Sequence, residues 1–180
     1  MKALLVFLDE SGFSKRSFLH RTWAPKGKTP IVIQTYNWKR LSAIAALMTT
    51  PTGRRVKLFL RLLPGNIRGP QVKNFLRALR WHFKGRHLIL LWDRLRAHRG
   101  KMMQQFLKDQ KDWLTTEYFP TYAPELNPVE YFWAYVSGTD LANFCADHLE
   151  AVRKQVHKAA CRVRHRLDLG QAFLKHSSLF

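Results

Sequence analysis

Short apolar runs separated by turn residues divide the first half of the chain into a series of predicted strands. Residues 3–9 and 87–92 are mostly apolar and are bounded by polar residues, which is typical of buried strands. Residues 54–61 alternate basic and apolar side chains with the period of two expected of an edge strand. Further short strands are predicted at residues 17–23, 31–36, 40–50 and 114–119. The chain is therefore expected to build a sheet before most of its helices.

In most of the remaining segments apolar residues recur with the spacing of a helix. In residues 69–83 one apolar face is formed by Val72, Phe75, Leu76 and Leu79. Longer helices are predicted at residues 97–113 and 140–166, and a short one after Leu167. Strands followed by alternating strands and helices indicate an α/β fold with a mixed central sheet. The length of 180 residues, without a long linker, predicts a single domain over residues 1–180.

The stretch from Tyr118 to Trp133 predicts a strand end, a proline-rich turn and the start of a helix. Asn127 is a favourable N-cap, Pro128 suits the first helical position, and Glu130 follows the cap by three residues. Two interpretations of Glu130 remain open here. It completes a capping box that satisfies a free backbone N–H, or it is a functional carboxylate on the inward face of the helix.

Two other acids favour the functional interpretation. Asp9 ends the apolar run of residues 3–8, and Asp93 ends the apolar run of residues 88–92. The chain has only 12 Asp and Glu residues, so a carboxylate at the end of two buried strands is unexpected by chance. Asp9, Asp93 and Glu130 together are predicted to form a metal-binding triad of carboxylates.

The net charge points to a polyanionic partner. The chain has 31 Lys and Arg residues and a formal charge of +19, which favours nucleic acid over the small substrates of metabolic enzymes. The alternative is a merely solvated basic surface. No apolar run approaches the ~20 residues of a membrane span, so no membrane association is expected.

Cys145 and Cys161 provide no disulfide framework, which is consistent with a reducing cytoplasm. They also form His–Cys pairs of the kind found in zinc sites. However, His148 and His157 on one helix would lie ~13 Å apart, too far for four ligands to meet one zinc ion.

Four motifs, in this order, carry a family resemblance over nearly the whole chain. They are Leu8-Asp-Glu-Ser-Gly-Phe13, Thr22-Trp-Ala-Pro-Lys-Gly27, Leu90-Leu-Trp-Asp93 with His98, and Tyr122-Ala-Pro-Glu-Leu-Asn-Pro-Val-Glu130 with Trp133. The chain resembles the DDE nuclease domain of mariner-superfamily transposases, in the bacterial insertion-sequence branch numbered 630.

The resemblance implies an RNase H-like fold and metal-dependent cleavage and transfer of DNA strands at transposon ends. It implies two Mg²⁺ ions, for which Mn²⁺ substitutes, with Asp9 bridging both, Asp93 holding one and Glu130 the other. It also implies DNA partners at the transposon ends and target, and a homodimer in the active complex. Relatives carry helix-turn-helix modules before this domain, so either an upstream reading frame that supplies them or a truncated remnant of such a protein is expected. The expected location is the bacterial cytoplasm, at the nucleoid during activity.

Basic residues near Asp93 are candidate DNA contacts: Arg94, Arg96, Arg99 and Lys101. Arg94 departs from the resemblance, because relatives more often have Asn there. His98 is expected either to contact phosphate or to orient an acid. The basic face of residues 140–166 is a further candidate surface for flanking DNA. Two other functions stay open at this point, a catalytically silent DNA-binding remnant and a nuclease that cuts without joining.

Overall fold

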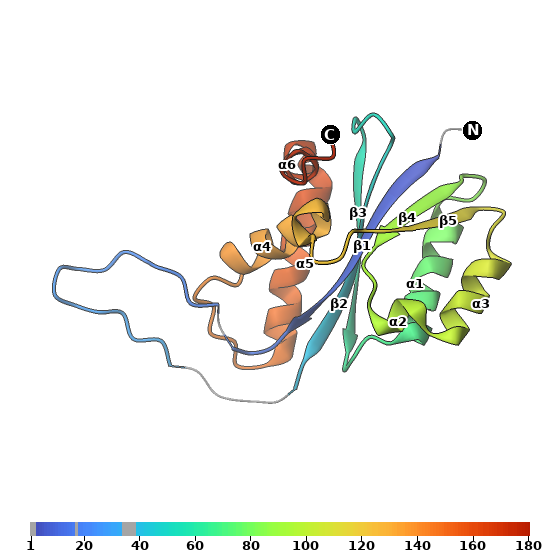
Figure 1. Ribbon diagram of the computed structural model, residues 1–180. Helices are drawn as coiled ribbons and strands as arrows, with labels where there is room; N and C mark the ends of the chain where they lie inside the picture. Colours follow the sequence, from blue (N-terminus) through green and yellow to red (C-terminus); the bar gives the residue numbers. More distant parts are fainter. Residues whose placement is uncertain (1–2, 17, 34–38) are drawn as a thin grey trace.

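A five-stranded mixed sheet forms the centre of the molecule (Figure 1). The computed structural model describes residues 3–16, 18–33 and 39–180, except for the side chains of residues 96 and 97. The strand order is β3-β2-β1-β4-β5, with antiparallel pairing among the first three strands and parallel pairing among the last three. The strands are β1 (Leu4–Phe13), β2 (Leu41–Thr49), β3 (Val56–Pro64), β4 (Leu88–Trp92) and β5 (Leu114–Tyr118).

Helices cover both faces of the sheet, as Figure 1 shows. On one face lie α1 (Gly69–His82), α2 (Arg96–Arg99) and α3 (Lys101–Asp109). On the other lie α4 (Pro128–Gly138), α5 (Leu149–His165) and α6 (Leu167–His176). Side chains of β1 alternate between the two layers, since Phe7 packs towards α4–α6 and Leu8 towards α1–α3. The predicted α/β class with a mixed sheet and flanking helices is confirmed.

The predicted strands at residues 17–23 and 31–36 are wrong for the residues that the structure describes. Phe18 makes one isolated bridge to Ala142, and residues 19–33 form an exposed loop that extends away from the body (Figure 1). Residues 17 and 34–36 lie outside the described residues. The physical reason is the sheet order: β1 has β2 on one side and β4 on the other, so it has no free edge for these segments.

Two predicted helices are shorter than expected. The helix predicted at residues 97–113 is divided into α2 and α3 at Gly100, whose backbone is extended, and Met102 is exposed. The helix predicted at residues 140–166 begins only at Leu149. Before it, Asn143 adopts a positive φ of 54° and its side-chain amide bonds both backbone groups of His20, which holds this segment outside helical geometry.

The parallel pairing of β1 and β4 brings two acids to the same level. Phe7 pairs with Leu91, so Asp9 and Asp93 each follow two residues further along their strands. The N-terminus of α4 packs beside β1, and the Asn127 side chain donates to the Leu8 carbonyl oxygen at 3.3 Å. The sheet and α4 therefore place three predicted site residues around one pocket.

Candidate active site

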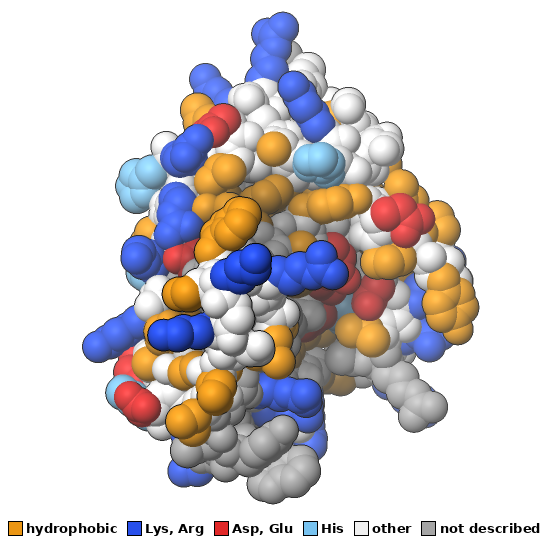
Figure 2. Space-filling model, turned by 90° about the vertical axis from the view of Figure 1, so that its left-hand side faces the viewer, with side chains coloured by type: hydrophobic (Ala, Val, Ile, Leu, Met, Phe, Trp, Pro, Cys, Tyr) orange, Lys and Arg blue, Asp and Glu red, His pale blue; other side chains and the backbone are white. Residues whose placement is uncertain are grey.

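Asp9, Asp93 and Glu130 line one pocket of about 200 Å³. Its other walls come from the proline-rich turn between β5 and α4: Phe119, Pro120, Tyr122, Ala123, Pro124 and Asn127. In Figure 2 acidic side chains gather in a recess near the centre of the face, with Lys and Arg side chains beside it. The structure therefore brings the three predicted acids to a shared cavity.

The cap of α4 separates the two interpretations of Glu130. Asn127 caps the helix, because its side-chain oxygen accepts from the Val129 N–H at 3.2 Å. The Asn127 N–H, which a capping box would direct to Glu130, donates instead to the Pro124 carbonyl oxygen at 2.9 Å. The Glu130 carboxylate is thus not needed for the cap and is available to the pocket.

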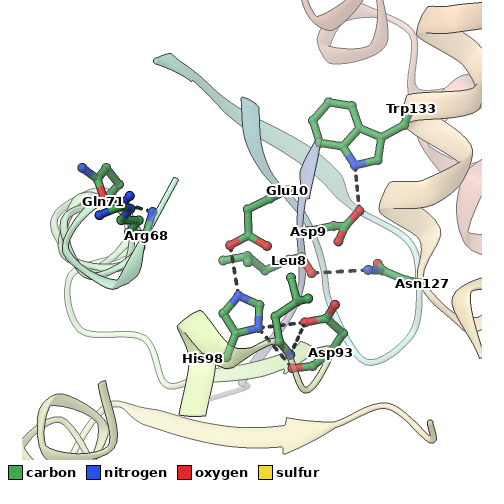
Figure 3. Close-up of polar contacts among 10 residues, drawn as sticks. Leu8, Asp9, Glu10, Arg68, Gln71, Asp93, His98, Asn127 and Trp133 are labelled. Carbon is green, nitrogen blue, oxygen red and sulfur yellow. Dashed lines mark hydrogen bonds and ion pairs between the residues drawn. The ribbon is translucent and has the colours of Figure 1, made fainter. Parts of the chain in front are cut away.

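Asp9 is a buried carboxylate with one strong partner. Its Oδ2 accepts a hydrogen bond of 2.8 Å from Nε1 of Trp133, one turn after Glu130 on α4 (Figure 3). Burial, followed by the negative charges of Glu130 and Glu10, raises the pKa of Asp9 to about 8. Burial and the charge of Asp93 also raise the pKa of Glu130. Burial is the larger cause for both carboxyl groups, and repulsion from neighbouring acids adds to it.

Asp93 is held by a buried histidine that links it to a fourth acid. His98 Nδ1 lies 2.8 Å from Asp93 Oδ1, and His98 Nε2 lies 3.0 Å from Glu10 Oε1 (Figure 3). The imidazole stacks on Trp92 with ring centroids 4.1 Å apart. Burial opposes protonation of His98, but the hydrogen bonds to Asp93 and Glu10 outweigh it and raise its pKa to about 10. Burial would raise the pKa of Asp93, yet the hydrogen bonds from His98 and the Leu95 N–H lower it.

The donor set of the pocket suits a hard divalent cation. All three acids offer oxygen ligands, which Mg²⁺ and Mn²⁺ prefer. Burial first, and repulsion between the acids second, raise the pKa values of Asp9 and Glu130, and a bound cation would favour the ionised form of both. Within the described residues, however, no three His, Cys, Asp or Glu side chains are already gathered closely enough to hold one ion. The acids line one cavity without converging on a single point.

The predicted DNA-contact residues have different environments. The Arg94 guanidinium lies over the Tyr118 ring, 5.6 Å from its centroid. Arg99 and Lys101 are exposed at the junction of α2 and α3. The side chain of Arg96 lies outside the described residues. His98 is fully buried and orients acids, so of its two predicted roles the structure favours the second.

Sequence reasoning missed the part that Glu10 plays. The alternation of side chains along β1 places Glu10 on the face opposite Asp9. That face is where His98 is buried, 88 residues later in the chain. The available signals were Glu10, directly after Asp9, and His98, five residues after Asp93. Neither signal indicates by itself that the two residues pair.

Tyr122 is an unusual residue at the rim of the pocket. Its side chain is 97% exposed although it lines the cavity that contains the acids. Its backbone has a φ of 59°, a left-handed conformation that bulky residues rarely adopt. Such conformations persist where the surrounding structure imposes them, often at functional sites.

Comparisons with known proteins identify one family model and several similar structures. Residues 4–153 match the profile described as DDE superfamily endonuclease. The structure of the Mos1 mariner paired end complex with Mn is similar, with a TM-score of 0.68 and 18% identity over 97% of this chain and 52% of that one. The Mos1 mariner catalytic domain gives a TM-score of 0.54 and 18% identity over 96% of this chain and 81% of that one.

The likeness to these structures supports the fold. The chain spans about half the length of the transposase chain in the paired end complex. A comparison with curated proteins finds no match. Among the described residues no helix is long and apolar enough to cross a membrane. The fold is RNase H-like, and with the profile covering most of its length the chain belongs to the DDE superfamily endonucleases.

Proposed function

We propose that this chain is the catalytic domain of a transposase that cleaves DNA at transposon ends and joins the cut strand to a target. The observation that carries the proposal is the shared pocket, to which β1, the residue after β4, and α4 contribute Asp9, Asp93 and Glu130 respectively. Membership of the DDE superfamily endonucleases supports the cleavage step. Strand transfer is supported by the similarity to Mos1, of which one structure is named a strand transfer complex.

In this proposal Asp9, Asp93 and Glu130 hold two Mg²⁺ ions, or Mn²⁺ in their place. Structures of the Mos1 catalytic domain are named with each of these metals. When bound, such a pair of ions activates the attacking oxygen and stabilises the leaving oxygen of a phosphodiester. Trp133 fixes one oxygen of Asp9, and His98 fixes one oxygen of Asp93. Each of these contacts leaves the other carboxylate oxygen available to a metal.

DNA is the proposed substrate, both at the transposon ends and at the target. The net charge of +19 supports a polyanionic partner, and the exposed ring of Tyr122 is positioned to stack on a nucleotide that enters the pocket. Arg94, Arg96, Arg99 and Lys101 are proposed to contact phosphates beside it. The resemblance of residues 122–130 supports the further proposal that the chain belongs to the bacterial insertion-sequence branch numbered 630, and the proposed place of action is the nucleoid. A homodimer and an upstream helix-turn-helix reading frame complete the proposed machinery.

The experiment separates three functions with one substrate set. The purified protein is incubated with supercoiled plasmid and a labelled duplex with a recessed end, in Mg²⁺ or Mn²⁺. Joined product supports a transposase, and nicking without joining supports a nuclease. Absence of both, together with equal Mn²⁺ binding by the wild type, Asp93→Asn and Glu130→Gln in calorimetry, would contradict the proposal. The two variants are isosteric, so circular dichroism should report an unchanged fold.

A further inference from the structure

A basic groove follows the β3 edge of the sheet, away from the acidic pocket. Two adjoining cavities of about 470 and 490 Å³ meet at Leu60. Their floor is β3 and one wall is α5, which packs along this strand. Figure 1 shows β3 at one side of the sheet with α5 close to it. Six Lys and Arg residues line the two cavities against one acid, Glu150: Lys57, Arg61, Arg153, Lys154, Lys158 and Arg164.

Two arginines of α5 are anchored to the strand edge. Arg153 Nη1 donates to the Leu62 carbonyl oxygen at 3.4 Å, and Arg164 Nε donates to the Leu58 carbonyl oxygen at 2.9 Å. These bonds cover backbone groups that an edge strand otherwise leaves open. They also hold both guanidinium groups along the groove, at the two sides of Leu60. The cationic lining is therefore partly ordered before any ligand binds, which reduces the entropy lost on binding.

Arg153 also pairs with Glu150 at 3.2 Å, but two other basic residues of the groove have no ion-pair partner in the part of the chain that the structure describes. Arg61 and Lys154 are exposed, and no hydrogen bond or ion pair joins either to another described residue. By contrast Arg162, on the same helix, is used internally, because it forms a bidentate ion pair with Asp140 at 2.8 Å. Arg162 and its neighbour Arg166, which pairs with Asp168, are therefore neutralised within the chain, whereas Arg61 and Lys154 remain available to a ligand.

The dimensions suit a phosphate backbone. From Arg153 to Arg164 the helix rises ~16 Å, a length over which duplex DNA carries about ten phosphates. Leu60 pairs with Ala45, and Ala45 pairs with Asp9, so the groove lies in the same cross-strand row as the acidic pocket. Two strand spacings place it ~10 Å from the Asp9 backbone. One DNA molecule is long enough to reach both.

We infer that the groove between β3 and α5 is a second DNA-binding surface, which holds the sugar–phosphate backbone of the duplex beyond the reacting phosphate. The inference rests on the proposed function for the identity of the DNA. The groove offers charge but few hydrogen-bonding side chains that read base edges, so binding is independent of sequence. Its contribution falls as salt rises, because each phosphate contact releases counterions.

The test is a salt titration of DNA affinity in EDTA, without catalysis. Fluorescence anisotropy measures the Kd of a labelled duplex of about 30 base pairs over a range of salt concentrations. Arg61→Ala/Lys154→Ala is compared with Lys108→Ala/Lys111→Ala. The control removes two exposed lysines from a cavity of similar size, about 480 Å³, at the opposite edge of the sheet. Both double variants lose the same net charge.

We expect the groove variant to bind at least about ten-fold more weakly at low salt and to reduce the slope of log K against log salt by about 1.8. The control should keep the wild-type slope. Equal losses of DNA affinity in the two double variants would overturn the inference, as would an unchanged salt slope in the groove variant. So would displacement of DNA by polyglutamate of equal charge at equal concentration. Mn²⁺ binding should be the same in the groove variant as in the wild type. A failure of the groove is thereby distinguished from a failure of the metal pocket.

Discussion

Asp9→Asn should stabilise the metal-free protein while removing its proposed metal site. Asp9 is 8% exposed, and burial with the charges of Glu130 and Glu10 raises its pKa to about 8 from an ordinary 3.8. The folded state therefore holds the proton more tightly than the unfolded chain. The stability that this proton confers is complete below about pH 4 and is lost progressively as the pH rises to about 8.

The size of the effect follows from linkage. At about 1.4 kcal/mol per pH unit, ionising buried Asp9 costs at most about 6 kcal/mol at pH 8. Relaxation around the charge reduces this ceiling, so we expect a gain of at least about 2 kcal/mol for Asp9→Asn at pH 8. The side-chain oxygen of asparagine still accepts from Trp133 Nε1, which preserves the contact that holds residue 9.

The assay is urea unfolding in EDTA at pH 5, 6.5 and 8, with the free energy of unfolding compared at equal m-values. The advantage of Asp9→Asn should grow with pH, and Mn²⁺ should stabilise the wild type only. Asp93→Asn is the matched control, for which the expected change in the free energy of unfolding has the opposite sign. His98 lowers the pKa of Asp93, so loss of this carboxylate should destabilise the protein at pH 8. An Asp9→Asn advantage that does not change with pH, or a less stable Asp9→Asn at pH 8, would refute the reasoning.

Two further changes probe the surroundings of the pocket, and a third probes the ion pair that joins α5 to the segment after α4. Glu10→Gln should weaken Mn²⁺ binding several-fold with little change in fold, since it removes the charge that holds His98 against Asp93; calorimetry and circular dichroism measure the two effects. Tyr122→Ala should weaken the binding of a recessed DNA end by about 1–3 kcal/mol, whereas Tyr122→Phe should retain it; equal affinities in anisotropy would exclude stacking. Arg162→Met should lower the free energy of unfolding by about 3 kcal/mol because Asp140 is left buried without its partner, and adding Asp140→Asn should recover part of this loss in urea unfolding.

The sequence was informative where local chemistry decides the structure. Buried apolar runs gave β1 and β4, helical spacing gave α1, and Asn127 with Pro128 gave the start of α4. Since each acid of the pocket directly adjoins one of these elements, the pocket could be predicted along with them. The prediction that three acids meet required only parallel pairing of β1 with β4, which an α/β order favours.

Tertiary contacts explain where prediction failed. Residues 140–148 have a helical pattern, yet the segment is held by Asn143 against His20, 123 residues earlier in the chain. Residues 18–33 have a strand-like composition, but β1, the strand that precedes them, is already paired on both sides with β2 and β4. The Glu10–His98 contact joins residues 88 positions apart on the face of the sheet opposite Asp9. Local propensity contains no information about any of these distances.

The pleat of β1 directs the side chains of Asp9 and Glu10 to opposite faces of the sheet, where they make different contacts. Asp9 faces α4 and the pocket, while Glu10 faces the opposite layer and reaches His98, which in turn holds Asp93. The position of Asp93 therefore depends on the strand that carries Asp9, although the two acids belong to different strands. Four of the chain's 12 acids meet in this region, in a protein with a net charge of +19. Only one buried cation, His98, lies among those acids in the described residues. Such segregation keeps the surface attractive to a polyanion and leaves one recess attractive to a divalent cation, which are the two electrostatic requirements of metal-dependent chemistry on DNA.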